Sequence, residues 1–160
     1  MKDLIKKILK EETEEIFVIP GLHYFPDGIN GLKNFIQKKN ITKWSLDDNL
    51  YLSRYESDLT WLEGLVSISG YLDLEGKKIK SLDNLKSVGH SLDLFGTKIK
   101  SLDNLQSVGG YLDIRGTQIK SFGNLQSVGG NLYLNEYLSE KYTDKEIRSM
   151  ISVGDFINRP

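Results

Sequence analysis

Three consecutive segments of this chain repeat one 20-residue pattern, and no other feature of the sequence constrains the fold as strongly. The segments read YLDLEGKKIKSLDNLKSVGH (71–90), SLDLFGTKIKSLDNLQSVGG (91–110) and YLDIRGTQIKSFGNLQSVGG (111–130). A related 22-residue unit precedes them at 49–70, and a further unit begins at Asn131 as NLYLN. Repetition at a fixed period of this size is typical of stacked-repeat architectures.

Apolar residues recur at fixed positions of each unit. Each unit begins with x-L-x-L, and this period of two predicts a short strand with both leucines facing inward. The later apolar residues lie three apart, as from Ile99 to Val108, which favours tight turns or 3₁₀ geometry. Stacked units bury these residues in one core and align their strands in a parallel ladder. Glycines at 89, 109 and 129 are expected to permit the bend to the next strand.

The shared pattern, L-x-L-x-G-T-x-I-x-S-L-x-N-L-x-S-V-G-G, resembles the leucine-rich-repeat family in a compact form over about residues 49–135. It is similar to short repeats of bacterial and bacteriophage proteins, and its I-x-x-L-x-x-L-x-x-V portion is similar to internalin-type repeats. The resemblance implies an α/β repeat solenoid with a parallel sheet of about five strands. The family's usual Asn after the strand is replaced by Thr or Lys, and a different asparagine column occupies positions 84, 104 and 124.

The flanking segments are expected to be caps, because the ends of a solenoid expose apolar surface. Residues 1–48 are predicted as an N-terminal cap with two helices, one over 2–16 and one near Asn30–Lys39. Residues 136–160 are predicted as a C-terminal capping helix and tail. This helix is expected to begin at a capping box and to run to about Ser152. The capping-box residues are Thr143 and Glu146, and the residues expected to face the last repeat are Ile147, Met150 and Ile151.

Composition limits the chemistry. The chain has 160 residues, no cysteine and a formal net charge of −1. Disulfides and thiolate zinc sites are excluded, and the charge gives no reason for general affinity for nucleic acid or an acidic membrane. No apolar run approaches the roughly 18 residues of a membrane span. The chain begins without a signal-peptide pattern, so we expect a cytoplasmic protein.

The sequence offers little to an enzyme. Its histidines are His23 and His90, and no Ser/His/Asp order, H-x-x-x-H spacing or phosphate-loop pattern is present. We therefore expect no catalysis and no cofactor. The remaining catalytic hypothesis places an active site within residues 1–48, where His23, Tyr24 and Asp27 are the one cluster that can be nominated.

The outer face of the predicted strands is the most informative surface, because alternation along each strand points one set of side chains outward. Tyrosine, phenylalanine and arginine gather there, and these residues commonly anchor protein interfaces. We expect this face to bind a partner protein that presents a basic segment. The candidate binding residues are Tyr71, Asp73, Asp93, Phe95, Tyr111, Asp113, Arg115 and Tyr133.

Three interpretations of the stacked Asp73, Asp93 and Asp113 stay open at this point. Aspartate is a poor strand former, and stacked carboxylates repel one another, so something must offset the cost. The aspartates receive a basic segment of the partner, or repeat duplication copied one solvated, tolerated aspartate. A third interpretation is a calcium site, although Ca²⁺ takes about six oxygen ligands.

A separate lysine column, Lys80, Lys100 and Lys120, predicts a basic edge. These lysines serve solubility, or they bind an acidic partner or a nucleic-acid backbone. A nucleic-acid-associated protein is therefore the alternative to a protein-binding module. The preferred hypothesis remains recognition of a partner protein, and the similarity to bacteriophage and mobile-element repeats suggests inhibition of a host defence protein.

Overall fold

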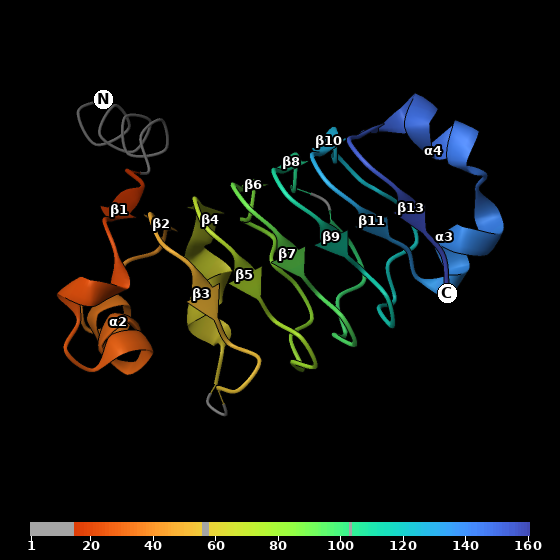
Figure 1. The fold of residues 1–160 in the computed structure, drawn as a ribbon. Helices are drawn as coiled ribbons and strands as arrows, with labels where there is room; N and C mark the ends of the chain where they lie inside the picture. Colours follow the sequence, from red (N-terminus) through yellow and green to blue (C-terminus); the bar gives the residue numbers. More distant parts are fainter. Residues whose placement is uncertain (1–14, 56–57, 103) are drawn as a thin grey trace, which may run out of the picture.

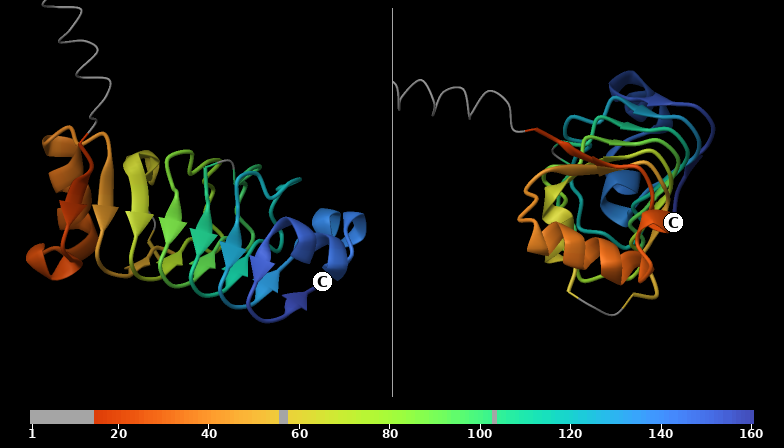
Figure 2. Two further views of the ribbon diagram at one scale, coloured as in Figure 1. Left: turned by 90° about the horizontal axis from the view of Figure 1, so that it is seen from above. Right: turned by 90° about the vertical axis from the view of Figure 1, so that its left-hand side faces the viewer.

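The computed structural model describes residues 15–55, 58–102 and 104–160, and the helix predicted over 2–16 falls almost entirely outside them. The chain winds into a β-solenoid of stacked coils (Figure 1). Each coil contributes short strands to two parallel sheets, and the apolar side chains fill the space between them. Figure 2 shows the coils along and across the solenoid axis.

The smaller sheet is built from the x-L-x-L segments, and it confirms the predicted parallel ladder. Neighbouring coils are in register, so Leu72 pairs with Leu92 and Asp73 with Asp93. The leucines of these strands are buried. In chain order, the strands are β3 (Leu50–Tyr51), β5 (Leu72–Asp73), β7 (Leu92–Asp93), β9 (Leu112–Asp113), β11 (Leu132–Tyr133) and β13 (Ile157–Asn158).

A second parallel sheet lies where the repeat predicts turns. In the regular coils each of its strands is a Ser-Val pair, with the serine partly exposed and the valine buried. Two residues are too few to show a period of two in the sequence. The seven strands are β1 (Phe17–Ile19), β2 (Trp44–Leu46), β4 (Leu65–Ile68), β6 (Ser87–Val88), β8 (Ser107–Val108), β10 (Ser127–Val128) and β12 (Ser152–Val153).

The glycine after each Ser-Val strand lies at a bend, as predicted, and it also allows close stacking of neighbouring coils. Gly109 does not have a positive φ. A Cβ at Gly109 would collide with the backbone carbonyl of Gly89, and the same relation joins Gly129 to Gly109. The bend after the first strand uses a different glycine, because Gly96 has a φ of 67°, in the left-handed region that favours glycine.

The three-residue apolar spacing forms tight turns, as predicted. Leu105 donates its backbone N–H to the carbonyl of Leu102 at 2.9 Å, and Leu125 repeats this bond with Phe122. Only coil 49–70 extends the turn into a described 3₁₀ helix, η2 (Thr60–Gly64).

The N-terminal segment contains the second predicted helix as α2 (Gly28–Lys38), after a short 3₁₀ turn, η1 (Leu22–Tyr24). Leu32 and Ile36 are buried, and the ring of Phe35 packs against Phe17 and Phe25. This segment also supplies β1 and β2, so the larger sheet begins before the repeats.

Two helices, α3 (Glu136–Lys141) and α4 (Asp144–Met150), interrupt the solenoid near its C-terminal end. α4 begins at the predicted capping box, with both reciprocal hydrogen bonds present. Ile147 and Ile151 are buried, but Met150 is 45% exposed, so the inward orientation predicted for Met150 is wrong. The segment interpreted as a tail continues the solenoid, because Ser152 already belongs to β12.

Candidate binding face

The outer face of the smaller sheet lies open between the two ends of the solenoid. In Figure 1 its strands run across the front, while α2 lies beyond β3 and α3 and α4 lie at the opposite end. Because the coils are in register, each outward position of the repeat forms a row across the coils. We call this surface the strand face. It carries four tyrosines, three aspartates, Phe95 and Arg115; the tyrosines are Tyr51, Tyr71, Tyr111 and Tyr133, and the aspartates are Asp73, Asp93 and Asp113.

A tyrosine row crosses the strand face. Tyr51 stacks on Tyr71 with ring centroids 5.4 Å apart, and Tyr111 meets Tyr133 edge-on at 5.9 Å. Tyr71 and Tyr111 are two coils apart, yet their rings lie 5.8 Å from each other and their hydroxyls hydrogen-bond. The coil between them carries the small Ser91, which leaves room for the two rings to lean together. Tyr51 was not among the predicted anchors, although it belongs to the same surface.

The hydroxyls of Tyr71 and Tyr111 are held in their neutral form. Burial raises the pKa of Tyr71, and its contact with the Tyr111 hydroxyl raises it further. Burial also raises the pKa of Tyr111, and the carboxylate of Asp93 acts in the same direction. The pair therefore presents a hydroxyl–hydroxyl bridge above apolar ring surface, with no phenolate near neutral pH.

The aspartate of each regular coil has a structural role. One carboxylate oxygen of Asp73, Asp93 and Asp113 accepts the backbone N–H two residues later, at 3.0, 2.9 and 3.0 Å. Such bonds fix a tight turn, here just before the glycine with positive φ. The aspartates are thus explained by turn geometry in addition to any binding role.

The second carboxylate oxygen differs from coil to coil. Asp113 is buried, and the Arg115 guanidinium donates to it at 3.1 Å from Nε and 2.5 Å from Nη2. Asp73 receives the Ser53 hydroxyl at 2.5 Å. Asp93 is half-buried, and its second oxygen accepts neither a hydroxyl nor a guanidinium hydrogen bond within the described residues.

Electrostatics single out the same residue. Burial raises the pKa of Asp93, and the charges of Asp113, Asp73 and Glu75 raise it further. The backbone N–H of Phe95 acts in the opposite direction. A cation placed beside Asp93 would relieve this unfavourable environment, so it is the carboxylate of the strand face best suited to receive one.

Arg115 is fixed by three neighbours. Besides its ion pair with Asp113, the guanidinium lies 5.3 Å from the Phe95 ring centroid and 4.9 Å from that of Tyr133. Its side chain is nevertheless 44% exposed, and Phe95 is 42% exposed. The result is a preorganised patch of an arginine between two aromatic rings.

All the predicted binding residues belong to strands or turns of the strand face, but Asp113 is buried beneath Arg115, so its predicted exposure is wrong. The binding of a partner by these residues stays a prediction. Other candidates lie elsewhere. Lys80, Lys100 and Lys120 are exposed on a different side of the coils. His23 packs on Tyr24 with ring centroids 4.1 Å apart. These residues and Asp27, which precedes α2, are exposed.

Over residues 15–55, 58–102 and 104–160, no group of three or more His, Cys, Asp or Glu side chains is placed to hold a metal ion. Within those ranges no helix has both the length and the apolar character needed to cross a bilayer. Protein-family models, curated proteins and solved structures yielded no match to this chain.

Proposed function

We propose that this chain is a non-catalytic binding protein of the leucine-rich-repeat type, which recognises a partner protein through the strand face. The observation that carries the proposal is one connected patch of exposed or half-buried aromatic rings around a fixed arginine. Tyrosine and arginine are enriched among the residues that dominate binding energy in protein interfaces. The patch comprises Tyr51, Tyr71, Phe95, Tyr111, Arg115 and Tyr133.

Preorganisation supports the proposal. The tyrosines touch one another along the row, and Arg115 is held by Asp113, Phe95 and Tyr133. Side chains that are already ordered lose little conformational entropy when a partner binds, and that cost is about 0.5–1.5 kcal/mol for each side chain that must be immobilised. A flat sheet face with fixed aromatic side chains suits a protein surface better than a small substrate.

The charge of the strand face favours a partner with a basic segment. Arg115 is paired with Asp113, and among the described residues no ion pair joins Asp73, Glu75 or Asp93 to an arginine or lysine. A lysine or arginine of the partner that reaches Asp93 would form the ion pair that this carboxylate lacks. We therefore assign Asp93 the recognition of a cation, and the aromatic patch the apolar contacts.

The resemblance of the repeats to those of bacteriophage and mobile-element proteins suggests where to look for the partner. We propose that the partner is a host protein, such as a host defence enzyme that the chain inhibits. We also propose that the two proteins meet in the cytoplasm. This step rests on the family resemblance alone.

The test is capture of partners from bacterial lysate on three immobilised forms of the protein, with quantification of each captured chain. Tyr51→Ser/Phe95→Ser removes two exposed rings from the strand face. Tyr24→Ser/Tyr137→Ser removes two exposed rings elsewhere and is the matched control. We expect a captured protein to be lost at least about tenfold by the first variant and retained by the control. Equal capture by all three forms, or equal loss in both variants, contradicts the proposal.

Nucleic-acid binding along the lysine edge is the second candidate. The observation in its favour is that Lys80, Lys100 and Lys120 are exposed at equivalent positions of three stacked coils. Lys120 also lies 5.9 Å from the ring of Tyr137. This function predicts retardation of DNA or RNA that weakens steeply with salt, and the absence of any retardation at low salt excludes it.

A further inference from the structure

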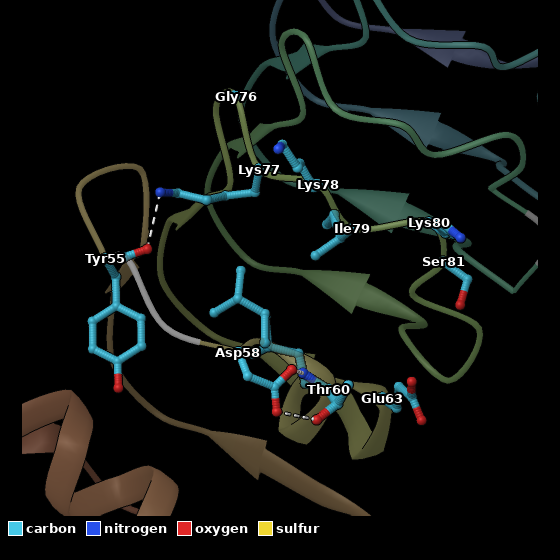
Figure 3. Close-up of a pocket in the computed structure, with 12 residues that line it drawn as sticks. Tyr55, Asp58, Thr60, Glu63, Gly76, Lys77, Lys78, Ile79, Lys80 and Ser81 are labelled. Atoms are coloured by element: carbon cyan, nitrogen blue, oxygen red, sulfur yellow. Dashed lines mark hydrogen bonds between the residues drawn. The ribbon is translucent and has the colours of Figure 1, made fainter.

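We infer that a crevice between coils 49–70 and 71–90 binds a small amphipathic anion. This ligand has an aromatic or aliphatic body and one carboxylate, sulfonate or phosphate group. The crevice has a volume of about 560 Å³, within the range of roughly 300–1,000 Å³ typical of small-molecule sites. It lies outside the strand face, between η2 and the segment that follows β5 (Figure 3), so the inference does not depend on the proposed function.

The crevice lies where the stacking departs from the regular repeat. Coil 49–70 is two residues longer than the coils that follow it. On the next coil, Ile79 is only partly buried, whereas its equivalents Ile99 and Ile119 are 1% and 0% exposed. Lys77 also occupies the position at which Thr97 is buried and bonds to a backbone carbonyl. The site is therefore specific to one pair of coils and is not a general feature of the solenoid.

An apolar surface lines the middle of the crevice. Leu59, Leu62 and Ile79 line it, and of these only Leu62 is fully buried. Figure 3 shows the Ile79 side chain extending from its coil toward the opposite wall. Covering this surface with the apolar body of a ligand is favourable by about 25 cal/mol for each Å² removed from water.

The polar groups around this surface favour an anion. Three lysines lie on one wall, where Lys78 and Lys80 are exposed on either side of Ile79. Lys77 donates to the backbone carbonyl of Tyr55 at 3.0 Å, which fixes its ammonium group at one end of the crevice.

The acidic groups of the opposite wall compete only weakly for these lysines. Asp58 accepts the hydroxyl of Thr60 at 2.6 Å and its backbone N–H at 3.1 Å. These hydrogen bonds lower the pKa of Asp58, because they stabilise its charged form. Glu63 is exposed to solvent. Among the described lining residues, the three lysines therefore outnumber the two carboxylates, and one of these carboxylates is already satisfied by its own turn.

The probe is 1-anilinonaphthalene-8-sulfonate, an aromatic anion whose fluorescence rises when it leaves water, titrated into the full chain. Lys78→Glu/Lys80→Glu reverses the charge beside the crevice. Lys98→Glu/Lys100→Glu makes the same change one coil later, where Ile99 is buried and lines a cavity of only about 10 Å³, and is the matched control. We expect saturable binding that the first variant weakens about tenfold or more and the control changes less than about twofold.

Two further measurements locate the site and test the role of charge. Amide NMR shifts during the titration are expected at 59–63 and 76–81. The uncharged analogue N-phenyl-1-naphthylamine is expected to bind at least about fivefold more weakly than the sulfonate. The inference is overturned by absent binding, by equal loss in both lysine variants, by equal affinity for the uncharged analogue, or by shifts centred on the strand face.

Discussion

One residue type at one position of the repeat has three environments in this protein. Asp73, Asp93 and Asp113 hold the same turn with one oxygen. The second oxygen accepts a serine hydroxyl in Asp73 and an arginine in Asp113, whereas that of Asp93 has no side-chain donor among the described residues. The repeat sequence predicted their alignment, but it did not distinguish them. The differences come from Ser53 and Arg115, which belong to positions that vary between coils.

Asp93→Asn is expected to stabilise the chain slightly at neutral pH. The amide keeps an oxygen for the Phe95 N–H and removes a charge that is disfavoured by burial and by neighbouring carboxylates. Because the folded-state pKa of Asp93 is raised, the wild-type carboxyl binds its proton more tightly when folded. The contribution of Asp93 to the free energy of unfolding is therefore most favourable below the unfolded pKa of about 3.9, and it decreases as pH rises through the folded pKa.

The gain from Asp93→Asn is therefore expected to be a few tenths of a kcal/mol at pH 7, after allowance for solvent screening, and to vanish at pH 3. Urea unfolding at the two pH values measures it. Asp113→Asn is the control of opposite sign, because it removes the partner of Arg115 at a buried position. A loss of stability for Asp93→Asn at pH 7 that matches the loss for Asp113→Asn would show that Asp93 is not strained by its charge.

Among the elements, the end strands of the larger sheet are closed against further pairing. In each interior coil, a backbone N–H bonds to the preceding coil, as when Gly129 donates to the carbonyl of Val108 at 2.8 Å. At β12, the end strand of the described sheet, the side chain of Arg148 in α4 donates in place of such backbone N–H groups. Arg148 donates to the carbonyls of Val153 and Asp155 at 2.6 and 2.5 Å, at the positions where an added coil would bind. Exposed strand edges are commonly blocked in such ways.

The first strand is closed by a different residue. Pro20 follows β1 at the position equivalent to Asp47, which donates its N–H to Ile19 in the preceding coil. Proline has no N–H, so β1 lacks one of the donors that would continue the ladder onto another molecule.

The double variant Pro20→Ala/Arg148→Met is expected to associate head to tail. It restores a backbone N–H beside β1 and frees the carbonyls of Val153 and Asp155 beside β12. Sedimentation velocity over a range of concentrations should show species larger than those of the parent chain. The single variants are expected to associate less, since each leaves one end closed. If the double variant sediments as the parent chain does at every concentration, these residues are not what closes the ends.

The sequence predicted these elements unevenly, for physical reasons. The x-L-x-L strands, α2 and the start of α4 were predictable because alternation, helical spacing and a capping box are local patterns. The Ser-Val strands were not, because their one apolar residue continues the three-residue spacing of the turns and shows no alternation of its own. The coil that ends the chain could have been found, since 152–154 reads Ser-Val-Gly, as 127–129 does.

The candidate sites show the same division. Columns of the repeat correctly placed Tyr71, Tyr111 and Asp93 on one face, but the sequence did not show that Tyr71 reaches Tyr111 across Ser91. The crevice was not predicted either. It depends on how a coil with two extra residues stacks on the next one, and this stacking is a feature of the tertiary structure.

At the scale of the whole molecule, the solenoid has one continuous core that no coil completes alone. Buried side chains run from Ile19 near one end to Val153 near the other as a single cluster. Backbone hydrogen bonds of both sheets join each coil to the next. The stability of such an array resides in the contacts between neighbouring coils, so damage to one coil is transmitted along the stack.

Leu134→Ala is therefore expected to destabilise both ends of the molecule together. Leu134 is 0% exposed, and truncation of a buried leucine costs about 3 kcal/mol. Trp44 and Trp61, the only tryptophans, are buried near the opposite end and stack with ring centroids 5.6 Å apart. In guanidinium unfolding, tryptophan fluorescence and far-UV circular dichroism should shift to the same lower midpoint, while Gln126→Ala, an exposed change, should shift neither. A fluorescence midpoint that stays at the wild-type value would mean that the two ends unfold as separate units.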